Sequence, residues 1–296
     1  MGSIVDSDGI DLEKAVKMVE DGTSLNDYSG GTTGLDAEAA IEQADANVLL
    51  EMTYTDIKTG EPAVTYMRKA IEKGMHIVTT NKGPVTLFYR ELKEKADAKG
   101  VRFLFEGTVM SGTPMLNLVR DTLAGSEVQC IQGILNGTTN FILTKMEEGM
   151  DYDTALTMAQ ELGYAEAVPD ADVKGWDALA KVTILANVVF GESLKPDDIP
   201  CQGITELTPA DIENAKSENK RFKLIGKVER KDGKIVAGVS PEKVDLTHPL
   251  ASISGATNAL TITTDTLGDV TIVGPGAGRR ETGFSMLIDL LKLGGK

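Results

Sequence analysis

Short apolar runs and segments with helical spacing alternate between residues 48 and 105. The runs 48–52, 76–80 and 101–105 predict strands, and residues 61–73 and 84–99, each followed by a glycine, predict helices. Short loops connect all five segments. This alternation predicts an α/β fold with a doubly wound, Rossmann-like parallel sheet.

The pattern changes character after Pro114 and predicts a second domain of the α+β class. A helix at residues 115–123 and a strand at 128–135 lead into residues 136–140, where Thr138 or Thr139 is the expected helix cap. Later segments predict a hairpin around Asp232-Gly233, two more strands and a last helix; they are residues 222–228, 234–239, 260–264, 270–273 and 279–293. We therefore divide the chain into a dinucleotide-binding domain of residues 1–114, joined by 274–296, and a substrate-binding and dimerisation domain of residues 115–273.

Residues 163–181, GYAEAVPDADVKGWDALAK, concentrate charge just before an apolar segment. We expect Gly163 to end one helix and Asp172 to cap the next, on which Asp177 and Lys181 lie four residues apart. Because that helix continues as apolar residues to Phe190, the pair is predicted to be partly buried at the mouth of a core helix. An ordinary intrahelical ion pair is the alternative.

Composition narrows the class of protein. The 296 residues are 41% apolar and 25% charged, which is typical of a soluble protein, and the net charge of -15 makes nucleic-acid binding unlikely. No segment has the length of a membrane span or the pattern of a secretory signal. The two cysteines, Cys130 and Cys201, fit a reducing cytoplasm better than a disulfide scaffold.

Polar residues follow the predicted parallel strands, where ligands of such sheets bind. Residues 53–55, 80–84 and 106–114 occupy these positions. Lys82 is either a site residue or a solvated turn lysine, and residues 106–114 are either a site or a connector. The glycine-rich turn at 274–278 precedes a helix and offers free backbone N–H groups to an anion, although such turns also serve plain packing.

Four of these motifs together closely resemble homoserine dehydrogenase: residues 80–84, GILNGTTNFIL at 133–143, the charged stretch at 163–181, and GPGAGRRETG at 274–283. The resemblance spans nearly the whole chain. It implies reversible interconversion of L-homoserine and L-aspartate 4-semialdehyde with NAD or NADP, in the route to threonine and methionine. It also implies a homodimer, and a form without an amino-acid-sensing domain.

The resemblance assigns site residues by position. Lys181 is the proton-transfer lysine and Lys82 a second active-site lysine, while the substrate-binding acids are Glu166, Asp172 and Asp177. The expected cofactor-binding residues are Asp6, Thr53, Thr80, Asn81, Lys82 and Gly276. The chemistry agrees, because an amino-acid ammonium needs carboxylates and the substrate hydroxyl must lose a proton as hydride leaves. A lysine accepts that proton if burial and a second cation lower its pKa.

Many members of the resembling family also hold a monovalent cation, sodium being the one that suits hard oxygen ligands. Here its ligands would be the Glu106 carboxylate and the backbone carbonyls of Val109, Ser111 and Thr113. The alternative is that Glu106 only caps or pairs locally.

The sequence departs from the family pattern in two places. Val168 stands where an acid usually precedes the proline. The family's first strand and G-x-G-x-x-G turn are also missing, so residues 3–9 would be the second strand. Asp6 at its end would then either bind a ribose hydroxyl or be a turn residue. We therefore expect a loose or rearranged cofactor half that binds dinucleotide poorly, and a second domain that still folds and dimerises. NAD and NADP are not distinguished.

Two other functions compete. An aspartate-semialdehyde dehydrogenase shares the substrate but needs a nucleophilic cysteine beside a histidine. Cys130 lies within a predicted strand, and neither His76 nor His248 has an active-site context. The second alternative is a truncated, cofactor-free homologue that serves as an inactive dimerisation partner.

Overall fold

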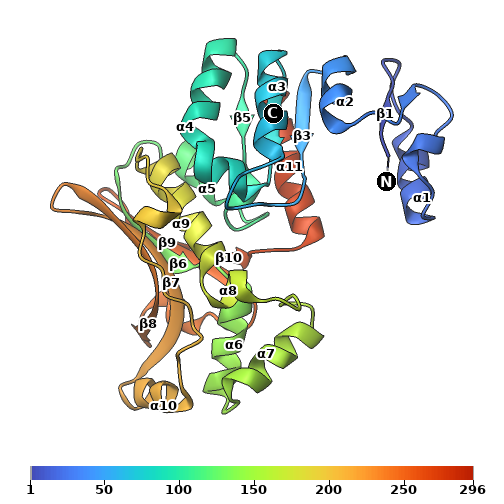
Figure 1. The fold of residues 1–296 in the computed structure, drawn as a ribbon. Coiled ribbons are helices and arrows are strands. Elements are labelled where there is room, and N and C mark those ends of the chain that lie inside the picture. The colour runs from blue at the N-terminus through green and yellow to red at the C-terminus, as the bar shows by residue number, and fades with distance from the viewer. Residues whose placement is uncertain (1, 296) are drawn as a thin grey trace.

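The computed structural model describes residues 2–295 and has two main parts, a parallel sheet with its helices and a larger antiparallel sheet with its own (Figure 1). The predicted α/β class, with a parallel sheet and a second α+β part, is confirmed.

The parallel sheet has the strand order β3-β4-β5. Its strands are β3 (Val48–Glu51), β4 (His76–Thr79) and β5 (Phe103–Leu104), and helices α3 (Ala63–Glu72) and α4 (Lys82–Lys99) connect them. Gly100 ends α4 in the left-handed conformation, as its position predicts. The last helix, α11 (Arg279–Leu293), also contacts this sheet, because its Met286 packs with Val78 of β4 and Leu104 of β5. The C-terminal helix therefore packs on the parallel sheet.

The N-terminal segment forms a small lobe beside the parallel sheet (Figure 1). It contains β1 (Ile4–Val5), α1 (Leu12–Glu20), the 3-10 turn η1 (Leu25–Asp27), β2 (Thr32–Thr33) and α2 (Ala37–Gln43). β1 pairs antiparallel with β2. The expectation that residues 3–9 form a strand of the parallel sheet is therefore wrong. A strand inside a parallel sheet is a fully buried apolar run. In contrast, β1 is only two residues long, and both of its residues are half-buried.

The antiparallel sheet has the order β10-β9-β6-β7-β8. Its strands are β6 (Val128–Ile134), β7 (Lys220–Lys231), β8 (Lys234–Asp245), β9 (Thr257–Thr264) and β10 (Gly268–Pro275). The predicted hairpin joins β7 and β8. Asp232 and Gly233 have φ angles of 51° and 74°, which suit a tight turn between twisted strands.

Helices α6 (Gly137–Glu147), α7 (Tyr152–Glu161), α8 (Asp170–Val173), α9 (Trp176–Val189) and α10 (Pro209–Ser217) accompany this sheet, with the short 3-10 turns η4 (Pro196–Asp198) and η5 (Pro249–Ser252). As predicted, α9 is a core helix, and Val182, Ile184 and Leu185 are buried. It packs against β7 and β8 and also against α4. This contact makes the core continuous between the two parts of the molecule.

The connection between the parts runs through η2 (Glu106–Thr108), α5 (Met115–Asn117) and η3 (Leu118–Thr122). The predicted helix at 115–123 is therefore one α-helical turn that widens into a π-helical turn. Within residues 2–295, no helix is both long and apolar enough to cross a membrane.

Candidate active site

Lys181 is the buried lysine of α9, with 6% of the residue exposed. Its Nζ donates to the backbone oxygen of Leu135, 2.6 Å away, and to Asp177 Oδ2, 2.7 Å away. Leu135 follows the last residue of β6, so the lysine connects α9 to the end of a strand. The predicted Asp177–Lys181 pair is present and partly buried, with side chains 17% and 8% exposed, so it is not a solvated surface pair.

Asp177 is shared by two lysines that come from different parts of the fold. Lys82, the first residue of α4, places its Nζ 3.6 Å from Asp177 Oδ1, while Lys181 bonds the other oxygen. Burial alone would raise the pKa of Asp177, but the charges of Lys181 and Lys82 outweigh it and hold this pKa well below its usual range. The packing of α4 on α9 thus brings the two predicted lysines together.

Asn136 is a site residue that the sequence analysis missed. Its Nδ2 donates to Asp172 Oδ1 at 2.7 Å and to Asp177 Oδ2 at 3.0 Å. Its Oδ1 accepts from the Thr139 N–H, so Asn136 caps α6. The prediction of a cap at Thr138 or Thr139 is wrong. The signal was available, since asparagine before a helix is a preferred cap.

Asp172 belongs to α8 and does not cap α9, which corrects the second capping prediction. The residue before α9 is Gly175, in the left-handed conformation with φ 83° and without a side-chain cap. The bend at Gly175 instead lets Asp172 share the amide of Asn136 with Asp177. Burial, and then the nearby charge of Asp177, raise the pKa of Asp172.

Glu166 lies in the exposed loop between α7 and α8. Its side chain makes no hydrogen bond or ion pair to any other described residue, although its backbone oxygen accepts from Gln160 Nε2. The structure does not bring its carboxylate into the Asp177 cluster. It leaves that carboxylate free for a ligand.

Polar groups line the carboxyl ends of β3 and β4. The buried Glu51 carboxylate accepts from the Thr53 N–H at 2.7 Å and from Thr79 Oγ1 at 3.0 Å. The Asn81 amide donates to the backbone oxygens of Thr53 and Tyr54 and accepts from Gly83, which caps α4. Asn81 is thus fully engaged within the protein, while Thr53 and Thr80 keep solvent access.

Asp6 lies in the turn after β1, where its Oδ1 accepts from the Asp8 N–H at 3.0 Å. Its assignment to a ribose hydroxyl required a strand of the parallel sheet, and β1 pairs with β2 instead. Gly276 lies in the turn between β10 and α11. A Cβ atom there would lie 2.0 Å from Asn258 Nδ2, so any other residue would require the Asn258 side chain or the turn to move.

The loop predicted to hold a cation is deeply buried. Glu106 is 3% exposed, and its two carboxylate oxygens accept from the N–H groups of Leu116 and Asn117, at 3.0 and 2.8 Å. Asp289 of α11 accepts from the Glu106 N–H, and its other oxygen has no partner. Burial, to which the nearby charge of Asp289 adds, raises the pKa of Glu106 to about 7. No ion pair between described residues includes either acid.

Two further observations concern metal-ligand clusters and cysteine catalysis. Across residues 2–295 there is no cluster of three or more histidine, cysteine or acidic side chains placed to hold a metal ion. Burial raises the pKa of the Cys130 thiol to about 11, so at neutral pH it is not the thiolate that a cysteine nucleophile requires.

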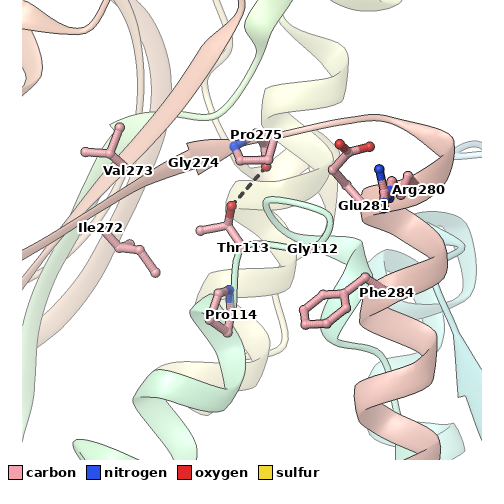
Figure 2. A pocket seen from close by; sticks show the side chains of 10 residues that line it. All are labelled: Gly112, Thr113, Pro114, Ile272, Val273, Gly274, Pro275, Arg280, Glu281 and Phe284. Carbon is pink, nitrogen blue, oxygen red and sulfur yellow. Dashed lines mark hydrogen bonds between the residues drawn. The ribbon is translucent and has the colours of Figure 1, made fainter.

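A cavity of about 470 Å³ lies where β10, the 112–114 loop and α11 meet. Figure 2 shows Thr113 Oγ1 donating to the backbone oxygen of Pro275, with Arg280 and Phe284 on the helix side. Neither Lys181 nor Lys82 lines this cavity. It marks the joint between the two parts of the fold, apart from the lysine cluster.

Comparison with known proteins decides the family. A sequence profile described as homoserine dehydrogenase matches residues 114–291. The NAD(+)-dependent homoserine dehydrogenase of Pseudomonas canavaninivorans is 46% identical over 99% of this chain and 84% of its own length. The homoserine dehydrogenase of Methanocaldococcus jannaschii is 40% identical over 99% of this chain and 86% of its own length. The chain belongs to the homoserine dehydrogenase family.

A solved homoserine dehydrogenase agrees with the fold. A hyperthermophilic archaeal homoserine dehydrogenase mutant in complex with NADPH superposes with a TM-score of 0.82, at 32% identity, over 96% of this chain and 83% of that one. Homoserine dehydrogenases are NAD(P)-dependent oxidoreductases, so the predicted family and reaction are confirmed. The comparisons give no support to the alternative of an inactive dimerisation partner.

Proposed function

We propose that Lys181 is the general acid/base with which this homoserine dehydrogenase moves the proton of the substrate hydroxyl. The observation that carries the proposal is the position of its Nζ, buried between the Leu135 oxygen and Asp177, with Lys82 on the far side of the same carboxylate. Two fixed acceptors hold the amine in one orientation, which proton transfer to a positioned substrate requires. Lys82 orients the substrate or relays the proton.

Oxidation of homoserine removes two hydrogens from one carbon–oxygen unit. The hydroxyl proton goes to the Lys181 amine as the C–O bond becomes a carbonyl, and bound nicotinamide supplies the acceptor for the hydride. In the reverse direction the Lys181 ammonium returns the proton to the carbonyl oxygen. Asp177 and Asn136 keep the lysine in place during both directions.

The acids around the cluster suit the ammonium of an amino-acid substrate. Glu166 is exposed and unpaired among the described residues, and the half-buried Asp172 carboxylate accepts from the Asn136 amide. A charge-assisted contact to Glu166 contributes to binding in the ground state and in the transition state alike.

Substitution of Glu166 tests this assignment. We expect Glu166→Gln to raise the KM for homoserine about tenfold with kcat nearly unchanged, because it weakens one charge-assisted hydrogen bond. Steady-state kinetics measure both constants, and Glu161→Gln, an exposed glutamate at the end of α7, is the matched control. An unchanged KM would remove Glu166 from the substrate site.

We place the dinucleotide at the carboxyl ends of β3 and β4, against Thr53, Thr80 and Lys82, with Gly276 on the opposite side. Asn81 acts by holding the backbone of Thr53 and Tyr54, since its own amide is engaged. The NAD(+)-dependent and NADPH-bound relatives support use of NAD or NADP. The weak affinity expected from the sequence stays a prediction, which fluorescence titration with NADH and NADPH tests.

The buried acids near η2 support a sodium site, formed by Glu106 with the backbone oxygens of Val109, Ser111 and Thr113. Glu106 and Asp289 bring two carboxylates into the interior without a paired cation among the described residues. Such uncompensated charge is costly, and a bound cation would offset it.

We keep the domain division of residues 1–114 with 274–296 and residues 115–273, which the packing of α11 on β4 and β5 supports. We also propose a homodimer in the cytoplasm, where the free thiols of Cys130 and Cys201 are stable. Light scattering of the purified protein tests the dimer.

A further inference from the structure

Asn258, the second residue of β9, carries a buried amide with no hydrogen-bond partner. The residue is 1% exposed, and both Nδ2 and Oδ1 lack partners. Folded proteins rarely retain such groups, because burial removes the water bonds that the amide had in the unfolded chain. Among the described residues, it is the one side chain whose buried donor and acceptor are both unpaired.

Asn258 lies opposite the end of the strand that anchors Lys181. Ala259 pairs with Ile134 at the end of β6, so the antiparallel register places Asn258 across from Leu135, whose oxygen binds Lys181. Side chains alternate along a strand, which puts Asn258 on the same face as Leu260 and Ile262. Those two residues pack into the core that α9 shares.

Gly276 lies directly over the Asn258 amide. A Cβ atom on Gly276 would fall 2.0 Å from Nδ2 and 2.5 Å from Oδ1, so glycine lets the turn approach the amide this closely without displacing it. The turn begins at Pro275, which Thr113 holds (Figure 2), and continues through the exposed Ala277 and Gly278. A ligand therefore reaches the amide only if this turn shifts away from it.

We propose that the Asn258 amide binds the carboxamide of the cofactor's nicotinamide ring, an inference that rests on the proposed function. Hydride transfer places that ring beside the substrate carbon whose hydroxyl faces Lys181. The carboxamide is attached to the ring carbon next to the one that takes the hydride, so its partner lies near the lysine. A primary amide offers one donor and one acceptor side by side, which is the complement of another primary amide.

The test compares two reduced dinucleotides in wild type and in Asn258→Ala. One is NADH or NADPH, whichever binds more tightly, and the other is its 3-acetylpyridine analogue, in which a methyl group replaces the carboxamide NH₂. We expect the substitution to weaken natural cofactor about tenfold, the effect of losing one or two hydrogen bonds, and the analogue by less than about threefold. Fluorescence titration gives the dissociation constants without turnover.

Thermal unfolding of the cofactor-free protein distinguishes this role from a structural one. Removing an unpaired amide should leave Tm unchanged or raise it, and Asn258→Leu, which is similar in volume, provides a second variant if alanine folds poorly. The matched control is Asn187→Ala, since Asn187 is a buried asparagine whose amide bonds both backbone groups of Leu194. That variant should lose Tm and keep the ratio of the two affinities.

Equal weakening of both dinucleotides, or no weakening of either, would overturn the inference. So would a wild-type protein that binds neither. A wild type that binds cofactor with the expected discrimination but oxidises no homoserine would instead overturn the proposed function and leave the role of Asn258 intact.

Discussion

Asp177 is a partly buried carboxylate and Glu106 a buried one, and the two differ in whether lysines accompany them. Asp177 has two lysines, and its pKa lies well below the usual range. Glu106 accepts from backbone N–H groups and has a second acid nearby, and burial raises its pKa to about 7 although the charge of Arg120 opposes this. Burial opposes the charged form of both acids, so the paired cations decide the outcome.

This difference separates two functions of buried charge. In the Asp177 cluster, two lysines pair with the carboxylate, and this pairing holds Lys181 in a fixed place. The Glu106 region has excess negative charge, which suits a bound cation. Three substitutions test the comparison, from the largest expected effect to the smallest.

Replacement of Lys181 should have the largest effect. We expect Lys181→Met to lower kcat about 10²–10⁴-fold, the usual contribution of a general acid/base, and to leave dinucleotide affinity within about twofold. Lys93→Met is the control, because Lys93 forms an ion pair of the same four-residue spacing with Asp97 on the exposed face of α4. Wild-type turnover in Lys181→Met would exclude the assignment.

The pH dependence of stability tests Glu106. Its folded pKa of about 7 lies above the ordinary 4.5, so the folded protein binds more protons than the unfolded chain between these values. The free energy of unfolding should therefore fall as pH rises through this window, by at most about 3 to 4 kcal/mol at ~1.4 kcal/mol per pKa unit. Urea unfolding at both ends of the window measures the fall, and Glu106→Gln should make it smaller by the contribution of this one carboxyl.

Bound sodium should recover part of the stability that the protein loses when Glu106 ionises. Above the window we expect sodium chloride to raise Tm relative to choline chloride at equal ionic strength, in wild type but not in Glu106→Gln. Glu147→Gln is the control, because Glu147 is a partly buried acid that also has a raised pKa but pairs with Arg221, away from the loop. A sodium effect that survives in Glu106→Gln would place the cation elsewhere.

Asp172→Asn should have the smallest effect on stability. The pKa of Asp172 is raised by burial and then by Asp177, so its carboxylate destabilises the fold once pH exceeds that pKa. Asparagine can still accept from Asn136 Nδ2, and we expect a gain of about 1 kcal/mol or less at neutral pH, with no gain in acid. Chemical unfolding at the two pH values measures it, and destabilisation at neutral pH would contradict this account.

Local sequence patterns predicted most of the helices and strands, because the formation of these elements depends mainly on residues close together in the sequence. The strand–helix alternation located β3, α3, β4 and α4, and the four-residue spacing located the Asp177–Lys181 pair. The family motifs then identified both lysines.

The tertiary structure alone decided the surroundings of these residues, because they come from segments far apart in sequence. Lys82 reaches Asp177 only through the packing of α4 on α9, and Asn136 joins Asp172 to Asp177 only because the chain bends at Gly175. The same reason explains the wrong prediction for residues 3–9, since whether two apolar residues enter a sheet depends on the strands available to pair with them.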